Sequence, residues 1–580
     1  MYVHLPENDY NDLVAAANVA DTVGETFTND LVMQLLTSEE PRYELLTQAY
    51  KNKIVTEYKT KNATMEFKIN GETSSFSKVT FSLGGSNSRS YKKIGYNLKI
   101  RGKQNLYDSV QFRIRAVINE PTMLRAKLTS DIFTRMGIKT INTGYIKLYI
   151  NDIYYGLYTI QDSIKVNWIE REYNDTGSTG LIFCKAPNQF LTLETGFDEC
   201  TNVNEDFTDN TEWVELLKSL DASQTPEEMN NYIDTKGFIK SMAAEWLNGS
   251  WDRFNHAGHN YYMYKNQEIG KWIYIPYDFD NELGNNLSGG AFYSKKLLGL
   301  SYTWPNVTFE DYIYPHHITE VLILNDDTTF VETVKELIQN IYNPVVLFDH
   351  IDEVKKLIDE AVRIDKTPAE DGSLPGRVHV DGDEGGDYRT YQANSEFTTV
   401  TIGINTFLGI KRWILDKFRF ACDLYDIDCS FAAEYLEGGF FTYEVDEELE
   451  NPGISFSSLL EAGISTIVPP PTQAESTETV APTTNVVAEP TQPAPTTNVV
   501  DEPNEAVTTD VVDEQSEAET VTVDDDDVSV EAEDSMESDS ECWSEVFGHP
   551  CCQKLDEVYE VDDNGSWGYE DGHWCGIIEV

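Results

Sequence analysis

Four polar residues in two short segments have the chemistry of a metal-assisted site. Asp252 and Asn260 lie in the segment SWDRFNHAGHNYYMY, and Asp278 and Asp280 lie in WIYIPYDFDNELG. Each pair stands beside an aromatic, strand-like run, and two antiparallel strands bring such ends together. The spacing therefore predicts that the four side chains share one site.

Phosphoryl transfer uses this set of groups. One carboxylate orients the acceptor hydroxyl, while an Asn and a further Asp hold a divalent metal against the phosphates. Mg²⁺ prefers oxygen ligands and keeps several waters, so few protein ligands are enough. The order Asp, Asn, strand, Asp is also that of protein kinases. Two other interpretations stay open: these are ordinary turn residues, or Asp278 and Asp280 bind a structural calcium ion.

The elements that must position these residues are strands first and helices later. Residues from about 60 to 160 alternate β-branched and aromatic residues with polar ones, which predicts a mainly antiparallel sheet interrupted by one helix, TMLRAKLTSDIFTRMGI. The pattern becomes helical from about 211 to 250 and again from about 317 to 425. The predicted fold class is α+β, with a β-rich N-terminal half and a helical C-terminal half.

The charge of the chain argues against two classes of partner. The formal net charge is −57, and from residue 421 onward there are 41 acidic residues and a single basic one, Lys554. Such an acidic excess repels phosphate backbones and anionic lipid surfaces, so we expect neither nucleic acid nor membrane partners. No apolar run approaches the roughly 18 residues needed to cross a bilayer.

The cysteines indicate a secreted, extracellular protein. They fall into local groups: Cys184 with Cys200, Cys422 with Cys429, and four in the C-terminal tail. Such groups favour disulfides in an oxidising compartment, with zinc ligands or free buried thiols as the alternatives.

Six glycosylation sequons are compatible with secretion. They stand at Asn62, Asn174, Asn248, Asn286, Asn306 and Asn564. The segment after Met1 lacks the basic and apolar regions of a signal peptide. A removed leader, a fragment, or an error in the argument for secretion would each account for this.

Two C-terminal segments differ from the rest of the chain. From 467 to 540 the composition changes to Pro, Thr, Val, Ala and acidic residues. This segment cannot bury enough apolar surface to offset its chain entropy, so we expect an extended, disordered linker. Residues 541–580 contain four Cys and three Trp, which predicts a small domain stapled by disulfides. Trp567 and Trp574 are its expected binding anchors, for protein or for sugar.

Residues from about 80 to 290 resemble the CotH (spore coat protein H) kinase family, an atypical branch of the protein-kinase-like fold. The matching stretches follow the family's order and are GGSNSRSYKKIGYNLKIRG, TMLRAKLTSDIFTRMGI, LYINDIYYGLYTIQD, SWDRFNHAGHNYYMY and IPYDFDNELG. The resemblance implies a kinase-like domain over 61–466, after an N-terminal extension over 1–60. It also implies ATP with Mg²⁺ or Mn²⁺ as cofactors and Ser or Thr of an unknown protein substrate as the acceptor.

The same resemblance assigns roles to the four polar residues of the two segments described first. Asp252 becomes the base on the acceptor side. Asp278 becomes the main metal ligand, supported by Asn260 and Asp280.

Further residues are candidates for the nucleotide side. Lys93 follows the SerArg element and would pair with the phosphates as a point charge, unless it is a surface lysine and Lys92 is the relevant one. Asp162 falls where the family commonly has Glu, with a shorter reach toward Lys93. Arg113 and Arg125 are further phosphate candidates, although such arginines are more often solvated surface charges.

Two neighbouring motifs give weaker signals. Gly84 and Gly85 precede Lys93 as a phosphate loop would, but the pair lacks the wider glycine pattern of such loops. His256 and His259 flank the site, either as metal ligands or, more commonly for such residues, as turn histidines that order the loop.

The tail resembles the small Cys-rich dockerins of anaerobic fungal cellulosomes. The matching elements are Cys542-Trp543, Gly548-His549-Pro550-Cys551-Cys552, Gly565-Ser566-Trp567-Gly568 and Trp574-Cys575-Gly576. The resemblance implies that residues 541–580 bind a scaffold protein of a cellulosome.

These features together predict a secreted atypical protein kinase of CotH type that is docked onto a cellulosome scaffold. The alternative is a non-catalytic structural or binding module with the same fold. A carbohydrate-active enzyme ranks third: paired Asp residues can act as acid and base, but Asn260 and Lys93 have no natural role in glycoside cleavage. Nucleotide binding that depends on a divalent metal separates the first two.

Overall fold

The computed structural model describes residues 1–19 and 56–451, with gaps at 86, 177–179, 198–199, 205–206, 208, 287–303, 381 and 403–404, and three strands between 560 and 577. The chain divides into two compact units, Met1–Ser476 and Thr477–Val580. The expected linker and most of the expected tail domain lie outside the described residues.

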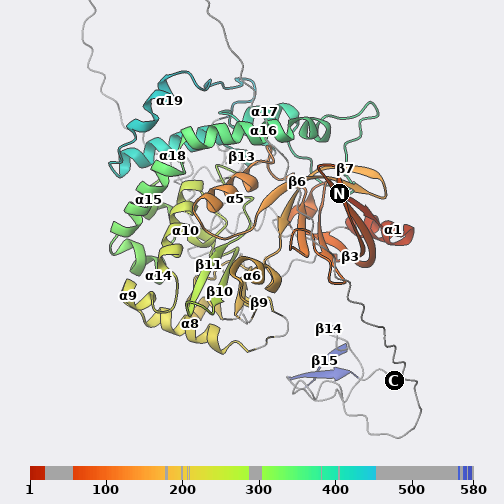
Figure 1. Ribbon diagram of the computed structural model, residues 1–580, viewed down its shortest axis with the longest axis horizontal. Coiled ribbons are helices and arrows are strands. Elements are labelled where there is room, and N and C mark those ends of the chain that lie inside the picture. The colour runs from red at the N-terminus through yellow and green to blue at the C-terminus, as the bar shows by residue number, and fades with distance from the viewer. Residues whose placement is uncertain are drawn as a thin grey trace, which may run out of the picture. The chain divides into compact units, whose positions relative to one another are not determined.

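The first part of the larger unit is a closed β-barrel (Figure 1). Its described strands follow the order β1-β2-β3-β4-β5-β7-β6, and neighbours are antiparallel except β1 with β6. The strands are β1 (Tyr2–His4), β2 (Lys59–Ile69), β3 (Glu72–Gly84), β4 (Gly95–Ile100), β5 (Gln111–Arg115), β6 (Thr143–Ile150) and β7 (Ile153–Asp162). The antiparallel sheet expected at 60–160 is present, and β1 joins it from the segment expected to be an extension.

Strand β5 shows how sequence alternation positions side chains. Phe112 and Ile114 are buried, while Arg113 and Arg115 are intermediate in exposure. Successive side chains of a strand point to opposite faces, so the two arginines share the face away from Phe112 and Ile114. That face carries the arginines of the candidate site.

The rest of the larger unit is mostly helical and contains a second sheet. This sheet has the order β11-β10-β8-β9 and consists of β8 (Leu181–Cys184), β9 (Cys200–Asn202), β10 (Tyr261–Asn266) and β11 (Lys271–Pro276). A separate hairpin pairs β12 (Val400–Ile402) with β13 (Asn405–Phe407).

The helices expected near 122–138 and 211–250 are present as α5, α8, α9 and α10, which confirms mixed helix and strand content. The described helices are α1 (Glu7–Ala17), α5 (Arg125–Arg135), α6 (Val166–Tyr173), α7 (Leu193–Gly196), α8 (Thr211–Ala222), α9 (Pro226–Met229), α10 (Thr235–Asn248), α11 (Phe254–Ala257), α13 (Phe309–Tyr312), α14 (His317–Thr319), α15 (Thr328–Asn340), α16 (Pro344–Lys366), α17 (Tyr388–Asn394), α18 (Ile410–Leu424) and α19 (Ala433–Glu437).

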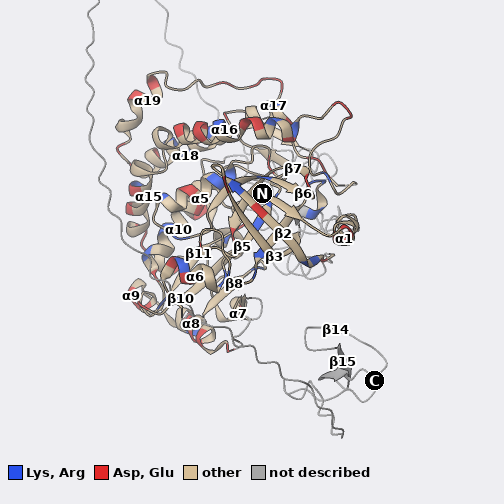
Figure 2. Cartoon of the chain, turned by 45° about the vertical axis from the view of Figure 1, so that its right-hand side comes forward, with Lys and Arg blue, Asp and Glu red and all other residues tan. Residues whose placement is uncertain are grey.

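Helix α16 links the barrel to the helical part. It begins where the Asn343 side chain accepts a hydrogen bond from the Val346 backbone N at 3.0 Å, with Pro344 in the first turn. Buried apolar residues such as Ile351 and Ile358 recur along it, with acidic and basic residues between them (Figure 2). The helix contacts both α18 and β7, so its last turn reaches the barrel.

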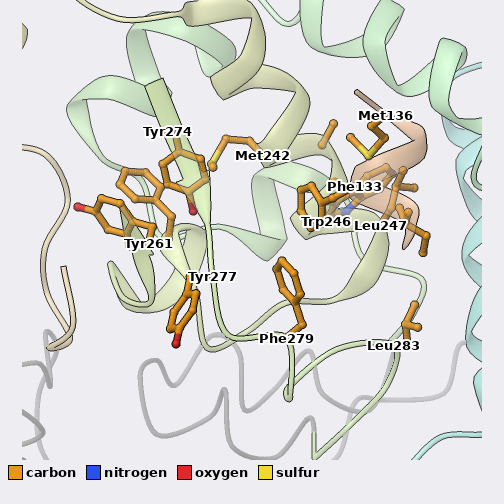
Figure 3. Packing of buried hydrophobic residues seen from close by; sticks show 14 of the residues in the cluster. Phe133, Met136, Met242, Trp246, Leu247, Tyr261, Tyr274, Tyr277, Phe279 and Leu283 are labelled. Atoms are coloured by element: carbon orange, nitrogen blue, oxygen red, sulfur yellow. The ribbon is translucent and has the colours of Figure 1, made fainter. Parts of the chain in front are cut away.

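Buried aromatic and aliphatic side chains support the two polar segments singled out by the sequence. Phe279 stacks on Phe133 of α5 with ring centroids 5.4 Å apart. Leu283 is also buried, and Figure 3 shows both residues with Trp246 and Leu247 of α10. Apolar anchors therefore flank the polar residues after β11 and fix where they point.

Two disulfides confirm the expected pairing of four cysteines. Cys184–Cys200 joins β8 to β9, and Cys422–Cys429 closes a short loop at the end of α18. The cysteines expected to staple the tail lie outside the side chains that the structure describes. Within the described ranges, no helix has both the length and the apolar character of a membrane span.

In the smaller unit, three strands form an antiparallel sheet with the order β14-β15-β16. They are β14 (Glu560–Val561), β15 (Ser566–Glu570) and β16 (His573–Ile577). Trp567 lies on β15 and Trp574 on β16.

Candidate active site

Asp252 lies on the loop that follows α10. The helix ends at Gly249, whose φ of 67° is left-handed and suits glycine. The Asp252 carboxylate contacts His259 Nδ1 at 3.1 Å and accepts a hydrogen bond from Asn281 Nδ2 at 3.0 Å. Its backbone carbonyl accepts from Asn260 Nδ2 at 3.0 Å. Three polar side chains thus orient a half-buried carboxylate.

Asp278 and Asp280 lie just past β11 and share one arginine. Arg115 Nη1 donates to Asp278 Oδ1 at 3.2 Å, and Arg115 Nη2 contacts Asp280 Oδ2. Asn119 Nδ2 also donates to Asp280 Oδ2, at 3.3 Å. Asp280 Oδ1 is buried and has no hydrogen-bond partner within the part of the chain that the structure describes. Asp278 has a φ of 62°, a left-handed conformation that Asp tolerates better than most residues.

The structure brings together the two segments that carry Asp252 with Asn260 and Asp278 with Asp280. Strands β10 and β11 pair in antiparallel register, with Tyr261 opposite Pro276. At the end of this hairpin the Tyr277 backbone N donates to the Asn260 carbonyl at 3.1 Å. His259, which contacts Asp252, also acts electrostatically on Asp278. The loop that carries Asp252 and the segment that carries Asp278 are therefore neighbours.

The two acidic residues past β11 differ in their proton affinity. Burial opposes ionisation of Asp278, but the charges of Arg115 and Arg113 outweigh it and hold its pKa below the ordinary value. Burial raises the pKa of Asp280 to about 6, against the effect of Arg115 and with that of the Asp278 charge. At neutral pH both carboxylates are available as anionic ligands.

Arg113 lies beside this acidic pair. Its Nη1 contacts the Tyr277 hydroxyl, and its guanidinium lies 5.2 Å from the centroid of the Tyr277 ring. Gly84 and Gly85 line a narrow hollow together with Arg113 and Arg115. The glycine pair and both arginines of β5 are thus close to one another, on the barrel side of the site.

Lys93 has other partners. Its ammonium pairs with Asp365 of α16 at 2.5 Å, donates to the Leu157 carbonyl at 2.7 Å and lies 4.3 Å from the centroid of the Tyr158 ring. Burial lowers its pKa to about 8, and Asp365 acts in the opposite direction. Lys93 is therefore a buried residue, which excludes the surface alternative.

Asp162 and Arg125 also have partners elsewhere. Asp162 pairs with Arg171 at 3.1 Å and accepts from Ser109 Oγ at 2.9 Å. Asp162 stands opposite Phe112 in the β5–β7 ladder, so it lies on the strand face away from Arg113 and Arg115. Arg125 is fully buried and pairs with Glu120 at 2.8 Å.

The two histidines near the site behave differently. His259 contacts Asp252, as described above, whereas His256 is buried and packs edge-on against Tyr312 at a centroid distance of 4.1 Å.

Three residues of the site escaped the sequence argument. Arg115 contacts both Asp278 and Asp280, whereas Asn119 and Asn281 each contact one predicted carboxylate, that of Asp280 and that of Asp252. Arg115 had a signal: it follows Arg113 by two positions in QFRIRAV, so the two share a strand face. Asn281 directly follows Asp280, but nothing in the sequence shows that its side chain turns toward Asp252.

A second arginine cluster lies behind the Asp252 loop. Arg253 is 1% exposed, pairs with Glu282 at 3.1 Å and donates to Ser250 Oγ at 2.6 Å. Its guanidinium lies 5.1 Å and 5.0 Å from the centroids of the Phe133 and Phe279 rings. Burial raises the pKa of Glu282 to about 8, although Arg253 acts in the opposite direction. This cluster ties the Asp252 loop to the segment that follows Asp280.

The oxygen atoms of the site fit a hard divalent cation better than zinc. The described residues contain no group of three or more His, Cys, Asp or Glu arranged to hold a metal ion. Asp278, Asp280 and Asn260 nevertheless carry side-chain oxygen atoms of the kind that such a cation prefers, and the buried Asp280 Oδ1 has no hydrogen-bond partner among the described residues. A Mg²⁺ or Mn²⁺ ion that keeps waters and contacts phosphate needs few such ligands.

The barrel, the helical part and the clustered side chains define a protein of mixed helix and strand content with a partly accessible group of acidic and arginine residues. The profile of the CotH kinase protein family matches residues 81–374. The chain belongs to this family. A second profile, described as a cellulose or protein binding domain, matches residues 541–577.

Relatives among characterised proteins divide in the same way. Over the larger unit the chain is 20% identical to inner spore coat protein H of Bacillus subtilis, covering 35% of this chain and 59% of that one. It is 23% identical to invasin CotH2 of Rhizopus delemar, covering 50% and 52%. The chain thus spans between half and three fifths of these relatives.

The tail matches a different class of protein. It is 50% identical over 44 residues to feruloyl esterase B of Piromyces equi, covering 7% of this chain and 8% of that one.

Among solved structures, the Helicobacter pylori proinflammatory kinase CtkA aligns with 59% of this chain and 95% of its own at 10% identity. Its TM-score of 0.25 is too low to carry a conclusion about the fold.

Proposed function

We propose that this protein is an atypical protein kinase that transfers phosphate from ATP to a Ser or Thr hydroxyl of a protein. The observation that carries the proposal is the meeting of two loops. Asp252 stands on one loop and Asp278 with Asp280 on the other, joined by the hydrogen bond from Tyr277 N to the Asn260 carbonyl at 3.1 Å.

Each residue has a chemical role in this proposal. Asp252 orients the acceptor hydroxyl and receives its proton, since His259 and Asn281 fix its carboxylate. Asp278, with Asn260 and Asp280 in support, would hold Mg²⁺ or Mn²⁺. The ion, when bound, neutralises charge on the transferring phosphate.

The β5 arginines belong to the phosphate side of this proposal. Arg115 neutralises the acidic pair in this structure, and it would be within reach of the phosphates if a metal ion took its place at the two carboxylates. Arg113 is already next to the acidic pair and free of direct contact with its carboxylates in the described structure. Guanidinium groups suit phosphate because they present parallel N–H donors.

Lys93 and Asp162 keep narrower roles. Lys93 reaches a nucleotide only if its ammonium exchanges Asp365 for a phosphate, because that pair is buried and tight. Asp162 pairs with Arg171 on the strand face away from Arg113 and Arg115, so its role is confined to joining β7 to α6.

A non-catalytic module is the second candidate, and one observation favours it. The Arg115 guanidinium already occupies the two carboxylates that a metal requires. If Arg115 never releases Asp278 and Asp280, no metal can bind there, and the fold serves only as a binding or structural element.

For the tail we propose attachment to a protein scaffold of a cellulosome outside the cell. The 44-residue match to an esterase of Piromyces and a 38-residue match at 53% identity to a Piromyces mannan endo-1,4-beta-mannosidase support a module shared by otherwise different proteins. The matched profile describes a cellulose or protein binding domain. Measuring how the full chain binds to scaffold protein and to cellulose decides between these two ligands. Loss of scaffold binding is expected for Trp567→Ala with Trp574→Ala.

The test of kinase activity is direct. The full chain is incubated with labelled ATP and Mn²⁺ beside the variants Asp252→Ala and Asp278→Ala. Label is expected in protein only with the unaltered chain. Equal labelling of all three proteins would show that the site is wrongly assigned.

A further inference from the structure

The sequons of the chain are not equivalent once it is folded. Two disulfides in the larger unit, Cys184–Cys200 and Cys422–Cys429, independently indicate an oxidising route such as the secretory pathway. On that route, an oligosaccharide can be attached to Asn in Asn-X-Ser/Thr, and the product must fold with the sugar at its surface. Of the sequons that the structure describes, Asn174 and Asn306 are exposed and Asn248 is buried, while Asn62, also exposed, donates its Nδ2 to Asp9 Oδ2 at 3.0 Å.

Asn174 stands at a surface turn. It is the exposed C-cap of α6 and has a left-handed φ of 51°. Thr176, the third residue of the sequon, is exposed as well. A hollow of about 300 Å³, lined by residues including Asn174, Tyr173 and Asn266, adjoins the turn. The side chain therefore projects where a first sugar has both space and polar neighbours.

Asn306 is exposed between two anchored residues. The carbonyls of Pro305 and Val307 both accept from Lys417 Nζ, at 3.0 Å and 3.3 Å. Trp246 Nε1 also donates to the Val307 carbonyl, at 2.8 Å. Because the neighbours are held inward, Asn306 itself faces outward, and a sugar there disturbs none of these contacts.

Asn248 is the opposite case. It is 0% exposed and is the last residue of α10. Its carbonyl accepts from Leu283 N at 2.6 Å. A Cβ on the next residue, Gly249, would lie only 2.4 Å from Trp413, so the packing around this sequon leaves no room. A chain that carries a sugar at Asn248 cannot close this part of the core.

We propose that Asn174 and Asn306 carry N-linked oligosaccharides, whereas the sequon at Asn248 stays unmodified in the folded protein. In the transfer, Asn Nδ2 forms a bond to C1 of the sugar and loses a proton. The bond between C1 and a lipid-linked pyrophosphate donor breaks, and the pyrophosphate leaves. This inference does not depend on the proposed kinase activity.

The test uses the full chain secreted from a eukaryotic host behind a heterologous leader. Peptide N-glycosidase in heavy-oxygen water converts each glycosylated Asn to labelled Asp, which peptide mass spectrometry detects. Label is expected at Asn174 and Asn306 and is expected to be missing at Asn248. A secreted, folded protein with label at Asn248, or without label at either of the other two positions, overturns the proposal.

Matched variants separate loss of the sugar from loss of the fold. Thr176→Ala and Asn174→Gln are expected to remove the same single oligosaccharide, while Thr176→Ser keeps it. Asn306→Gln removes the second oligosaccharide. After enzymatic removal of all sugars, the variants and the unaltered chain are expected to have the same melting temperature. If Thr176→Ala carries as many oligosaccharides as Thr176→Ser, the assignment of Asn174 is wrong.

Discussion

Two arginine–carboxylate clusters flank the same segment after β11, and they differ in exposure. In the first, Arg115, Asp278 and Asp280 have side-chain exposures of 16%, 23% and 8%. In the second, Arg253, Glu282 and Glu245 are exposed by no more than 1%. The residue types are nearly the same, so type alone does not distinguish a site that binds ligands from one that supports structure.

The difference lies in what surrounds the charges. Arg253 is enclosed by Phe133 and Phe279, and no ligand can enter without opening the core. The cluster at Arg115 is partly accessible, because the Arg115 and Asp278 side chains are 16% and 23% exposed. We infer that the closed cluster positions the Asp252 loop and the open one exchanges its arginine for a metal.

The largest expected effect concerns Asp252. Asp252→Asn keeps an oxygen that accepts from Asn281 but removes the base, so phosphate transfer should fall by about 10³-fold. Binding of ATP with Mn²⁺ should stay unchanged, because the metal ligands are intact. Labelled-phosphate assays and calorimetry measure the two effects. A loss of binding equal to the loss of transfer would place Asp252 on the metal side instead.

Changing Arg253 in the closed cluster should lower the free energy of unfolding. At about pH 9, where Glu282 with its pKa of about 8 is ionised, Arg253→Met leaves two buried carboxylates without their cation, and breaking such a pair costs about 3 kcal/mol of unfolding free energy. Adding Glu282→Gln should restore part of it, since one buried carboxylate is then neutral. Denaturant unfolding measures both variants. A cost below about 1 kcal/mol for the single variant would mean that the cluster does not hold the loop.

Changing Arg115 in the open cluster should shift the affinity for Mn²⁺ alone and the affinity for ATP with Mn²⁺ in opposite directions. Arg115→Met removes the cation that competes with the metal, so affinity for Mn²⁺ alone should rise by about tenfold. Affinity for ATP with Mn²⁺ should fall, because a phosphate partner is gone. Paramagnetic resonance of free Mn²⁺ follows the first change and calorimetry the second.

Arg113→Met is the matched control for this pair of measurements. Its guanidinium contacts the Tyr277 hydroxyl rather than the carboxylates, so it should weaken nucleotide binding without a comparable gain for Mn²⁺. If both variants shift both affinities alike, Arg115 does not act as a stand-in for the metal.

The smallest effect is a pH dependence. The pKa of Asp280 is raised to about 6 from an ordinary value of 3.8, so the folded protein takes up this proton as the pH falls through about 6. A metal must displace the proton. Mn²⁺ affinity should therefore fall by about threefold between pH values of roughly 6.5 and 5.5. Asp280→Asn should flatten this profile, and an unchanged slope in that variant would assign the proton to another group.

The sequence could predict the part of the site that is local. Asp252, Asn260, Asp278 and Asp280 belong to the β10–β11 hairpin and its flanks, so short-range pattern alone brings them together. Arg115 lies 163 residues before Asp278. Its approach depends on closure of the barrel, which no short pattern reveals.

The same limit applies to Lys93 and to the first strand. The partner of Lys93, Asp365, is 272 residues away and reaches it only because α16 runs from α18 to the barrel. Strand β1 closes the barrel by pairing with β6, which lies well over a hundred residues later. Three residues beyond a leading Met gave too short a pattern to predict a strand.

The central claim is that Asp278 and its neighbours bind a nucleotide through a divalent metal. Calorimetric titration of the full chain with ATP and Mn²⁺ tests it most directly, with Asp278→Asn beside Asp162→Asn, whose carboxylate pairs with Arg171 elsewhere. The account predicts metal-dependent binding in the unaltered chain and in Asp162→Asn, and its loss in Asp278→Asn. Binding of equal strength in Asp278→Asn, or none in the unaltered chain, would contradict it.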